Sequence, residues 1–252
     1  MTRPWLVPSL RGGWLLPFVL SMTAGAVDVI GFLALDGLFT AHITGNLVVL
    51  AVHYTTGGFC AVGPLLAVPV YVAVLGAVTL VSKVIEKSPS RRALLVLHAA
   101  LLAGSLGLGV GFGPFTNADT PMAVLVGMLG VAAMATQSAL VKLALPGTPS
   151  TAVMTTNITQ LAVDLATLAQ RRGESGERAL ARHRARATLP CILGFITGCA
   201  AGAVLEVHCG LWALALPATL AVIAVPLGEL WSDIPAMAQP RVRHQLRSST
   251  II

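Results

Sequence analysis

Residues 39–46 read FTAHITGN, and residues 150–157 repeat this pattern as STAVMTTN. Both stretches follow the order Thr-Ala-x-(Ile or Met)-Thr-x-Asn, and each opens a short apolar run. Seven residues beyond each asparagine stands a polar residue on the same helical face, His53 in the first copy and Asp164 in the second. The two copies indicate an internal duplication, and we take it as the core of the fold.

The composition excludes an ordinary soluble domain. Hydrophobic residues make up 56% of the chain and charged residues only 10%, whereas about 25% charged residues is usual in soluble proteins. The apolar residues form helix-length runs without the alternation of a barrel strand, and a bilayer admits only helices or closed barrels. The sequence therefore predicts an all-α polytopic membrane protein, with residues 1–252 in a single integral membrane domain and the lipid bilayer as its partner.

Six of the apolar runs have about the 20 residues that a membrane span needs. They cover residues 14–35, 63–82, 93–112, 122–141, 188–207 and 211–230. Two further runs, residues 44–55 and 155–170, are too short to span and are typical of re-entrant half-helices.

The positive charges favour one topology. If the two short runs enter and leave on the same side, all 16 Lys and Arg residues fall on one face of the membrane. If all eight runs span, or if only the first short run spans, the charges are divided between both faces. The positive-inside rule therefore predicts six spans with both termini in the cytoplasm. The arrangement in which only the first short run spans, with the N-terminus outside, is the alternative.

Six spans divided by the repeat give a 3+3 inverted repeat, because halves with three spans each insert in opposite directions. The halves cover about residues 14–112 and 122–230. A cytosolic loop at residues 171–187 and a tail at residues 233–252, which we expect to be disordered, lie outside them. Short segments at matching positions of two halves are the best sequence indication of a transport site.

The two Thr-x-Asn motifs are the candidate substrate site. If each short helix begins near the membrane midplane, its unpaired N–H groups face the centre of the protein and attract an anion or a polar group. The side chains that would line this site are Thr40, Thr44, Asn46, Thr151, Thr155 and Asn157. The alternative is that these residues only cap the helices. Capping would account for one such residue in each copy, but not for two threonines and one asparagine.

Asp28 lies inside the first span, where an ionisable residue is costly. It could carry a proton, bind a cation or the substrate, or act as a structural acid that hydrogen-bonds a re-entrant loop. Gln137 is its counterpart in the second half. His53 and Asp164 could form a proton pathway with Asp28, or lie at the wet ends of the short helices. His98 is expected at the membrane interface.

Glycines recur every fourth residue at positions 194, 198 and 202, and again at positions 107 and 111. This spacing predicts close helix packing. Of the four cysteines, Cys60 and Cys209 fall in loops on the predicted external side, where a disulfide is one option.

No enzyme is predicted, because the sequence has no HExxH, Walker A or GxSxG motif. The sequence indicates neither a cofactor nor a metal site. The net charge of +6 reflects topology signals and contact with lipid headgroups, so that nucleic acid is not an expected partner. A homo-oligomer is compatible with the sequence, which leaves the oligomeric state open.

The residues GAVD at 25–28 and the TGN turn at 44–46 resemble the YoaK-like family of bacterial multi-pass membrane proteins, whose domain is catalogued as one of unknown function (1275). Gln137 and residues 151–157 are similar to the second motif of that family. The resemblance covers about residues 21–231, and Thr156 stands where the first copy has Gly45. Membership implies a bacterial cytoplasmic membrane and no established activity.

Taken together, the sequence predicts a membrane transporter or channel for a small polar or anionic solute. The rival hypothesis is a membrane-embedded sensor or assembly protein without transport activity, in which the polar centre only holds the helices together.

Overall fold

The structure is a computed structural model that describes residues 13–56, 62–84, 90–170 and 175–231. Within this part of the chain every regular element is a helix, which confirms the all-α prediction. In chain order the elements are α1 (Leu15–Ala34), α2 (Gly45–Thr56), α3 (Val62–Val84), α4 (Arg91–Phe112), α5 (Pro121–Ala144), α6 (Met154–Ala169), α7 (Ser175–Cys209), the 3₁₀ helix η1 (Gly210–Leu214) and α8 (Ala215–Leu230).

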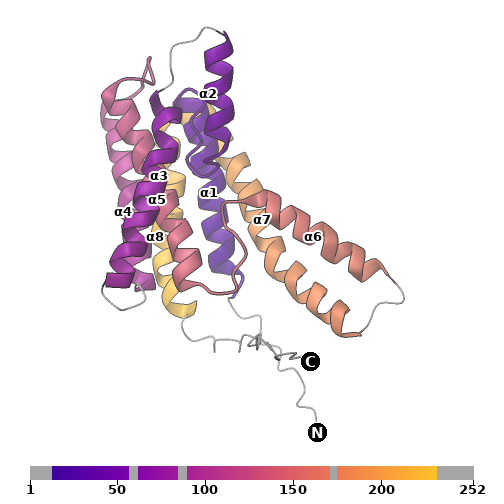
Figure 1. Cartoon of the computed structure of the whole chain (residues 1–252). Helices are drawn as coiled ribbons and strands as arrows, with labels where there is room; N and C mark the ends of the chain where they lie inside the picture. Colours follow the sequence, from indigo (N-terminus) through magenta and orange to yellow (C-terminus); the bar gives the residue numbers. More distant parts are fainter. Residues whose placement is uncertain (1–12, 57–61, 85–89, 171–174, 232–252) are drawn as a thin grey trace, which may run out of the picture.

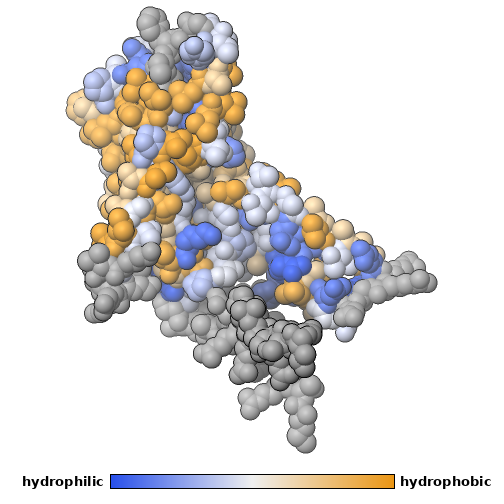
Figure 2. Space-filling model, viewed as in Figure 1, coloured by the Kyte–Doolittle hydropathy of each residue, from blue (hydrophilic) through white to orange (hydrophobic). Residues whose placement is uncertain are grey.

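Five helical stretches are long and apolar enough to cross a membrane. They are Leu15–Ala34, Val62–Ser82, Arg91–Phe112, Pro121–Ala144 and the 56-residue stretch Ser175–Leu230, which contains α7, η1 and α8. Apolar side chains cover much of the visible outer surface of these helices (Figure 2). Such a surface fits lipid better than water, so the chain is a membrane-embedded helical protein.

The helix bundle is organised around α1, which packs against α7, α8 and α5. Three glycines on one face of α7 allow its backbone to approach that of α1. They are Gly194, Gly198 and Gly202, which face Phe18, Met22 and Ala26. A Cβ atom added at Gly202 would lie 3.0 Å from the Ala26 Cα. The prediction that these glycines serve close packing is therefore confirmed, and the matching order of contacts shows that α1 and α7 run parallel.

The second predicted glycine pair does not pack against another helix of the chain. A Cβ atom at Gly107 or Gly111 would meet no described atom within 4 Å. The prediction of close packing within the chain is wrong here, because both residues lie on an exposed face of α4.

Arg91, at the start of α4, connects three helices at the lower end of the bundle, where α1 begins in Figure 1. Its guanidinium donates to the Gly228 carbonyl of α8 at 3.0 Å and to the Ala144 carbonyl of α5 at 3.3 Å. These carbonyls lie in the last turns of their helices, where a cation is favourable. One side chain thus connects α4, α5 and α8.

The short helices lie at opposite ends of the molecule. Figure 1 shows α2 at the upper end, while α6 and the first part of α7 diverge from the bundle at the lower end. We call this second feature the α6–α7 arm (residues 154–169 and 175–188). With 12 and 16 residues, α2 and α6 are about 18 and 24 Å long, less than the roughly 30 Å of a bilayer core.

The long and short helices begin and end close to the predicted runs, except that α7 begins at Ser175 rather than near residue 188. Residues 175–187 belong to the segment that was predicted as a cytosolic loop. They instead continue α7 and pack against α6, because the alanine, arginine, leucine and glutamate residues that dominate them favour a helix. Cys60 and residues 233–252 lie outside the described residues, as do the predictions made for them.

Candidate functional site

The Asp28 carboxylate is the centre of the first turn, residues 39–44. Its Oδ1 atom accepts hydrogen bonds from the amides of Thr40 at 2.7 Å and Ala41 at 2.6 Å. The His42 amide donates to Oδ2 at 3.1 Å. Only 4% of Asp28 is exposed. Asp28 therefore hydrogen-bonds the backbone of this turn, which is the structural role among those expected from the sequence.

The chain reaches Asp28 because it reverses direction sharply after α1. Asp36 and Gly37 have positive φ angles of 49° and 82°, which allow the reversal where most residues would be strained. The returning chain then lies against α1 at Gly31, where a Cβ atom would be 2.8 Å from the Leu38 carbonyl oxygen. The glycine thus permits the turn to pack directly on the helix that carries Asp28.

The Asn46 side chain forms hydrogen bonds with the backbone of the same turn. Its Oδ1 accepts from the Phe39 amide at 2.9 Å, and its Nδ2 donates to the carbonyls of Phe39 at 2.8 Å and Ile43 at 3.2 Å. The expectation of unpaired N–H groups at the start of α2 is wrong. The amides of residues 45, 46 and 47 donate to the carbonyls of residues 42, 43 and 44, because a tight turn precedes the helix.

The second turn, residues 150–153, is also held by a buried side chain of a long helix, but its partners are an amide and a hydroxyl group. Gln137 on α5 donates from Nε2 to the Thr151 hydroxyl at 2.9 Å and to the Leu20 carbonyl of α1 at 3.0 Å. The amides of Ala152 and Val153 donate to the Ser150 hydroxyl at 3.4 and 2.9 Å. Gln137 thus corresponds to Asp28 in position, as predicted, but Ser150 replaces the carboxylate as the acceptor of the turn amides.

The six candidate lining residues do not share one environment. Thr40, Asn46, Thr151 and Asn157 are buried within the turns, and Asn157 donates to the Ser150 carbonyl. Thr44 and Thr155 are exposed. The first turn contacts α1 directly at Asp28, whereas the second turn is connected to the Leu20 carbonyl of α1 through Gln137. Asp28 and Leu20 lie about 12 Å apart along α1.

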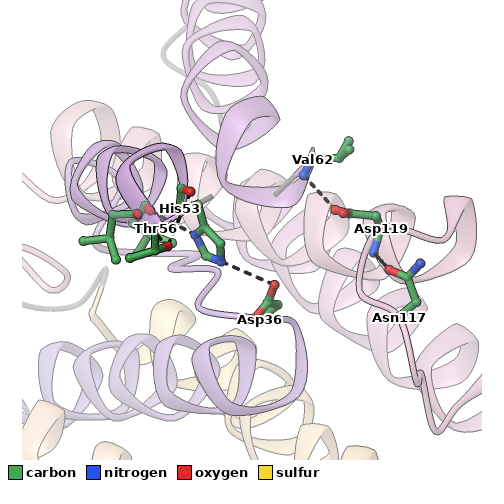
Figure 3. A network of polar contacts seen from close by, with 8 residues as sticks. Asp36, His53, Thr56, Val62, Asn117 and Asp119 are labelled. Carbon is green, nitrogen blue, oxygen red and sulfur yellow. Dashed lines mark hydrogen bonds and ion pairs between the residues drawn. The ribbon is translucent and has the colours of Figure 1, made fainter. Parts of the chain in front are cut away.

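His53 (Figure 3) lies in the last turn of α2, the helix at the upper end of the molecule in Figure 1. Its Nε2 lies 3.6 Å from the exposed Asp36 carboxylate, and its Nδ1 lies 3.0 Å from the Val49 carbonyl oxygen. Beside it, Asp119 accepts from the Val62 amide at 2.8 Å and thereby connects the loop before α5 to the start of α3.

Asp164, at the matching position of α6, is fully buried in the arm and paired with Arg184 of α7. The Arg184 guanidinium donates to Oδ1 through Nη2 at 2.6 Å and Nε at 3.0 Å. This hydrogen bonding holds the pKa of the Asp164 carboxyl below its ordinary value. Since α6 belongs to the arm and α2 to the upper end, no contact joins Asp164, His53 and Asp28 into the predicted proton pathway within the described residues.

His98 faces the interior of the bundle. It is fully buried, and its Nδ1 lies 3.0 Å from the Ala133 carbonyl oxygen of α5. Its expected position at the membrane interface stays a prediction.

Sequence reasoning missed two residues of the site, Ser150 and Arg184. Ser150 directly precedes the repeated Thr-Ala pair, and serine at such a position commonly accepts from nearby backbone amides. Arg184 lies in a run of arginines without a sign that it differs from the others. No group of three or more His, Cys, Asp or Glu residues suited to a metal occurs in the described part of the chain.

The search against curated proteins found no match, and neither did the search against solved structures. One protein family matches residues 16–227, which include both turns and the helices that hold them. The chain therefore belongs to the family described as protein of unknown function (DUF1275).

Proposed function

We propose that this chain is a six-span transporter or channel in which two inverted halves pass a small polar or anionic solute. The observation that carries the proposal is the pair of re-entrant turns, each held by a buried polar side chain, Asp28 or Gln137, of a long apolar helix. Buried polar groups inside a membrane protein are costly and commonly belong to substrate or ion pathways.

The count of six spans is supported by the stretch Ser175–Leu230, which contains two helices. In Figure 1, α7 rises to the upper end of the bundle and α8 returns to the lower end. Residues 210–214 form the connection between them as η1. With α1, α3, α4 and α5 this gives six crossings, and α2 and α6 remain as half-length helices on opposite sides.

The pairing of helices supports an inverted repeat. If α1 to α4 correspond to α5 to α8, the packing of α1 on α7 has its counterpart in that of α5 on α3. The packing of α2 on α3 likewise corresponds to that of α6 on α7, and α4 on α5 to α8 on α1. Inverted repeats of this kind place the substrate between the two halves in many secondary transporters.

The described conformation is closed. A cavity of about 10 Å³ lies beside Thr40 and Ser105, which is the space of roughly one water molecule. Three glycines, Gly31, Gly127 and Gly130, line it. Passage of a solute therefore requires a turn to move away from its helix, and a turn held by hydrogen bonds rather than by a covalent or metal link can do so.

The topology is tested with single cysteines in a cysteine-free background, labelled by a membrane-impermeant thiol reagent. Thr56→Cys at the end of α2 and Gln170→Cys at the end of α6 are both at exposed positions. We expect labelling from opposite sides of the membrane. Labelling of both from one side would overturn the inverted repeat.

Transport is tested by flux of small anions and neutral polar solutes into proteoliposomes. Thr44→Val and Thr155→Val remove exposed hydroxyls at the turns without removing a buried hydrogen bond. Thr219→Val, at an exposed position of α8, is the matched control. A lining role predicts slower flux for the first two variants only, with all three proteins equally folded.

The second candidate function is a sensor or assembly protein without transport. The observation that favours it is that the buried side chains of Asp28 and Asn46 and the amides of residues 39–41 are hydrogen-bonded inside the chain, so that these groups bind no solute in this conformation. This function predicts no flux above that of empty liposomes, and loss of folded protein rather than loss of flux when Asp28 is replaced.

A further inference from the structure

The first part of α7 diverges from the bundle at its lower end (Figure 1). With 35 residues the helix is about 52 Å long, whereas a bilayer core is about 30 Å thick. The parallel packing of α7 on α1 places Gly194 beside Phe18, so that Pro190 lies level with Trp14. Trp14 is 47% exposed, and tryptophan favours the headgroup level of a membrane. The membrane boundary on α7 therefore lies close to Pro190.

The outer face of α7 changes from basic to apolar at this boundary. Leu189 at the boundary and Leu193 and Ile196 above it are exposed by 44%, 47% and 57%. Below it, Arg182 and Arg186 are exposed and one helical turn apart. Leu189 follows Arg186 by three residues, so the arginines and the apolar side chains form one continuous stripe on the helix.

The other two arginines of this segment are held inside the arm. Arg184 is paired with Asp164, and Arg178 donates to the Leu168 carbonyl at 3.3 Å. Arg182 and Arg186, by contrast, have no side-chain hydrogen bond or ion pair within the described part of the chain. Two guanidinium groups thus remain available to an external ligand.

The charge around this pair is positive. Asp164 is neutralised by Arg184, and the exposed Glu177 lies more than one turn before Arg182, toward the start of the helix. Exposed His183 adjoins Arg182. An anion that approaches the pair from the membrane surface therefore meets a positive field, and its hydrocarbon part can lie along the leucines.

We propose that the stripe from Arg182 to Ile196 on α7 binds an anionic phospholipid. Arg182 and Arg186 contact the phosphate and the acidic headgroup, while Leu189 and Leu193 contact an acyl chain. Side chains four residues apart on a helix begin about 6 Å apart, and guanidinium groups bind phosphate with paired hydrogen bonds. The site does not depend on the proposed transport activity, because both turns lie elsewhere.

The experiment uses the full chain in a neutral detergent and counts bound lipids by native mass spectrometry. The probes are phosphatidylglycerol, phosphatidylcholine of the same acyl length, and inorganic phosphate. The test variant is Arg182→Gln/Arg186→Gln. The control variant, Arg92→Gln/Lys142→Gln, removes the same charge from two other exposed residues, one in the first turn of α4 and one in the last turn of α5.

We expect wild type and control to prefer phosphatidylglycerol. The test variant should bind it about 25-fold more weakly, because each arginine strengthens binding to an anionic surface about fivefold. Equal losses in both variants would show general charge attraction and overturn the site. Equal binding of the two lipids, or displacement of phosphatidylglycerol by millimolar phosphate, would overturn it as well. Arg182→Lys/Arg186→Lys, which keeps the charge but lacks the paired N–H donors, should still prefer phosphatidylglycerol and bind it more tightly than the glutamine variant, which excludes misfolding as the cause.

Discussion

The Asp28 Oδ1 atom lies 2.6 Å from the Ala41 amide nitrogen and 2.7 Å from that of Thr40. A buried carboxylate on the central helix thus holds the backbone of the first turn. The second turn is held differently, because Gln137 contacts the Thr151 side chain and Ser150 accepts from the turn amides. The first turn therefore depends on a carboxyl group, and the second on an amide and a hydroxyl group.

Replacing Asp28 by asparagine should loosen the first turn. The amide keeps the shape of the side chain but turns one acceptor oxygen into a donor that faces an N–H group. We expect a loss of about 1.5–3 kcal/mol in the free energy of unfolding, measured by unfolding of the purified protein in mixed detergent micelles. Thr40→Val, which removes only a contact of 3.4 Å from the hydroxyl, is the control and should change stability much less.

The two motif asparagines should differ in their contribution to stability. Asn46 makes three hydrogen bonds to the turn backbone, whereas Asn157 makes one to the Ser150 carbonyl and a weaker contact to the Met154 sulfur. At about 1 kcal/mol for each bond, Asn46→Ala should cost about 3 kcal/mol and Asn157→Ala about 1 kcal/mol. Equal losses in the same unfolding assay would contradict the asymmetry between the turns.

The sequence predicted the helices well, because the bilayer leaves few choices for an apolar run. The lengths of the apolar runs distinguished the membrane-spanning helices from the two short ones. The Thr-Ala-x-x-Thr-x-Asn repeat identified both turns. The correspondence of Asp28 with Gln137 also followed from the repeat, and each lies against the first threonine of its motif.

The partners of these polar groups could not be predicted in the same way. Whether Asn46 faces a solute or its own turn depends on the backbone reversal at Asp36 and Gly37, which no periodicity reveals. The contact of His98 with the Ala133 carbonyl likewise depends on how α4 packs on α5, which the sequence does not reveal. Gly107 and Gly111 have the same spacing as Gly194 and Gly198, and only the fold decides which pair meets a neighbour.

The buried pair of Asp164 and Arg184 should respond asymmetrically to mutation. Arg184 is 40% exposed on its side chain and can turn to solvent, whereas Asp164 is fully buried. Arg184→Gln leaves an unpaired buried carboxylate and should cost about 3–5 kcal/mol. Asp164→Asn should cost less, and the double variant should recover part of the loss. An equal cost for both single variants in the unfolding assay would show that Asp164 finds another partner.

The same pair should make stability depend on pH. Because Arg184 holds the pKa of Asp164 below its value in the unfolded chain, the pair stabilises the fold at neutral pH. This contribution is lost as the pH falls through the lowered pKa of the folded state. Unfolding measured at a series of pH values should therefore show a steeper acid-induced loss for wild type than for Asp164→Asn.

The close contact of α1 and α7 should make Gly198 sensitive to a single methyl group. A Cβ atom there would overlap the Met22 backbone carbonyl, and backbone cannot move aside as a side chain can. Gly198→Ala should therefore force the helices apart and cost about 1–3 kcal/mol. Gly107→Ala is the matched control, because a Cβ atom there meets no described atom within 4 Å. It should be neutral or stabilising by up to about 1 kcal/mol, since alanine favours a helix more than glycine does. If both variants unfold alike, the glycines of α7 do not set the distance between the two helices.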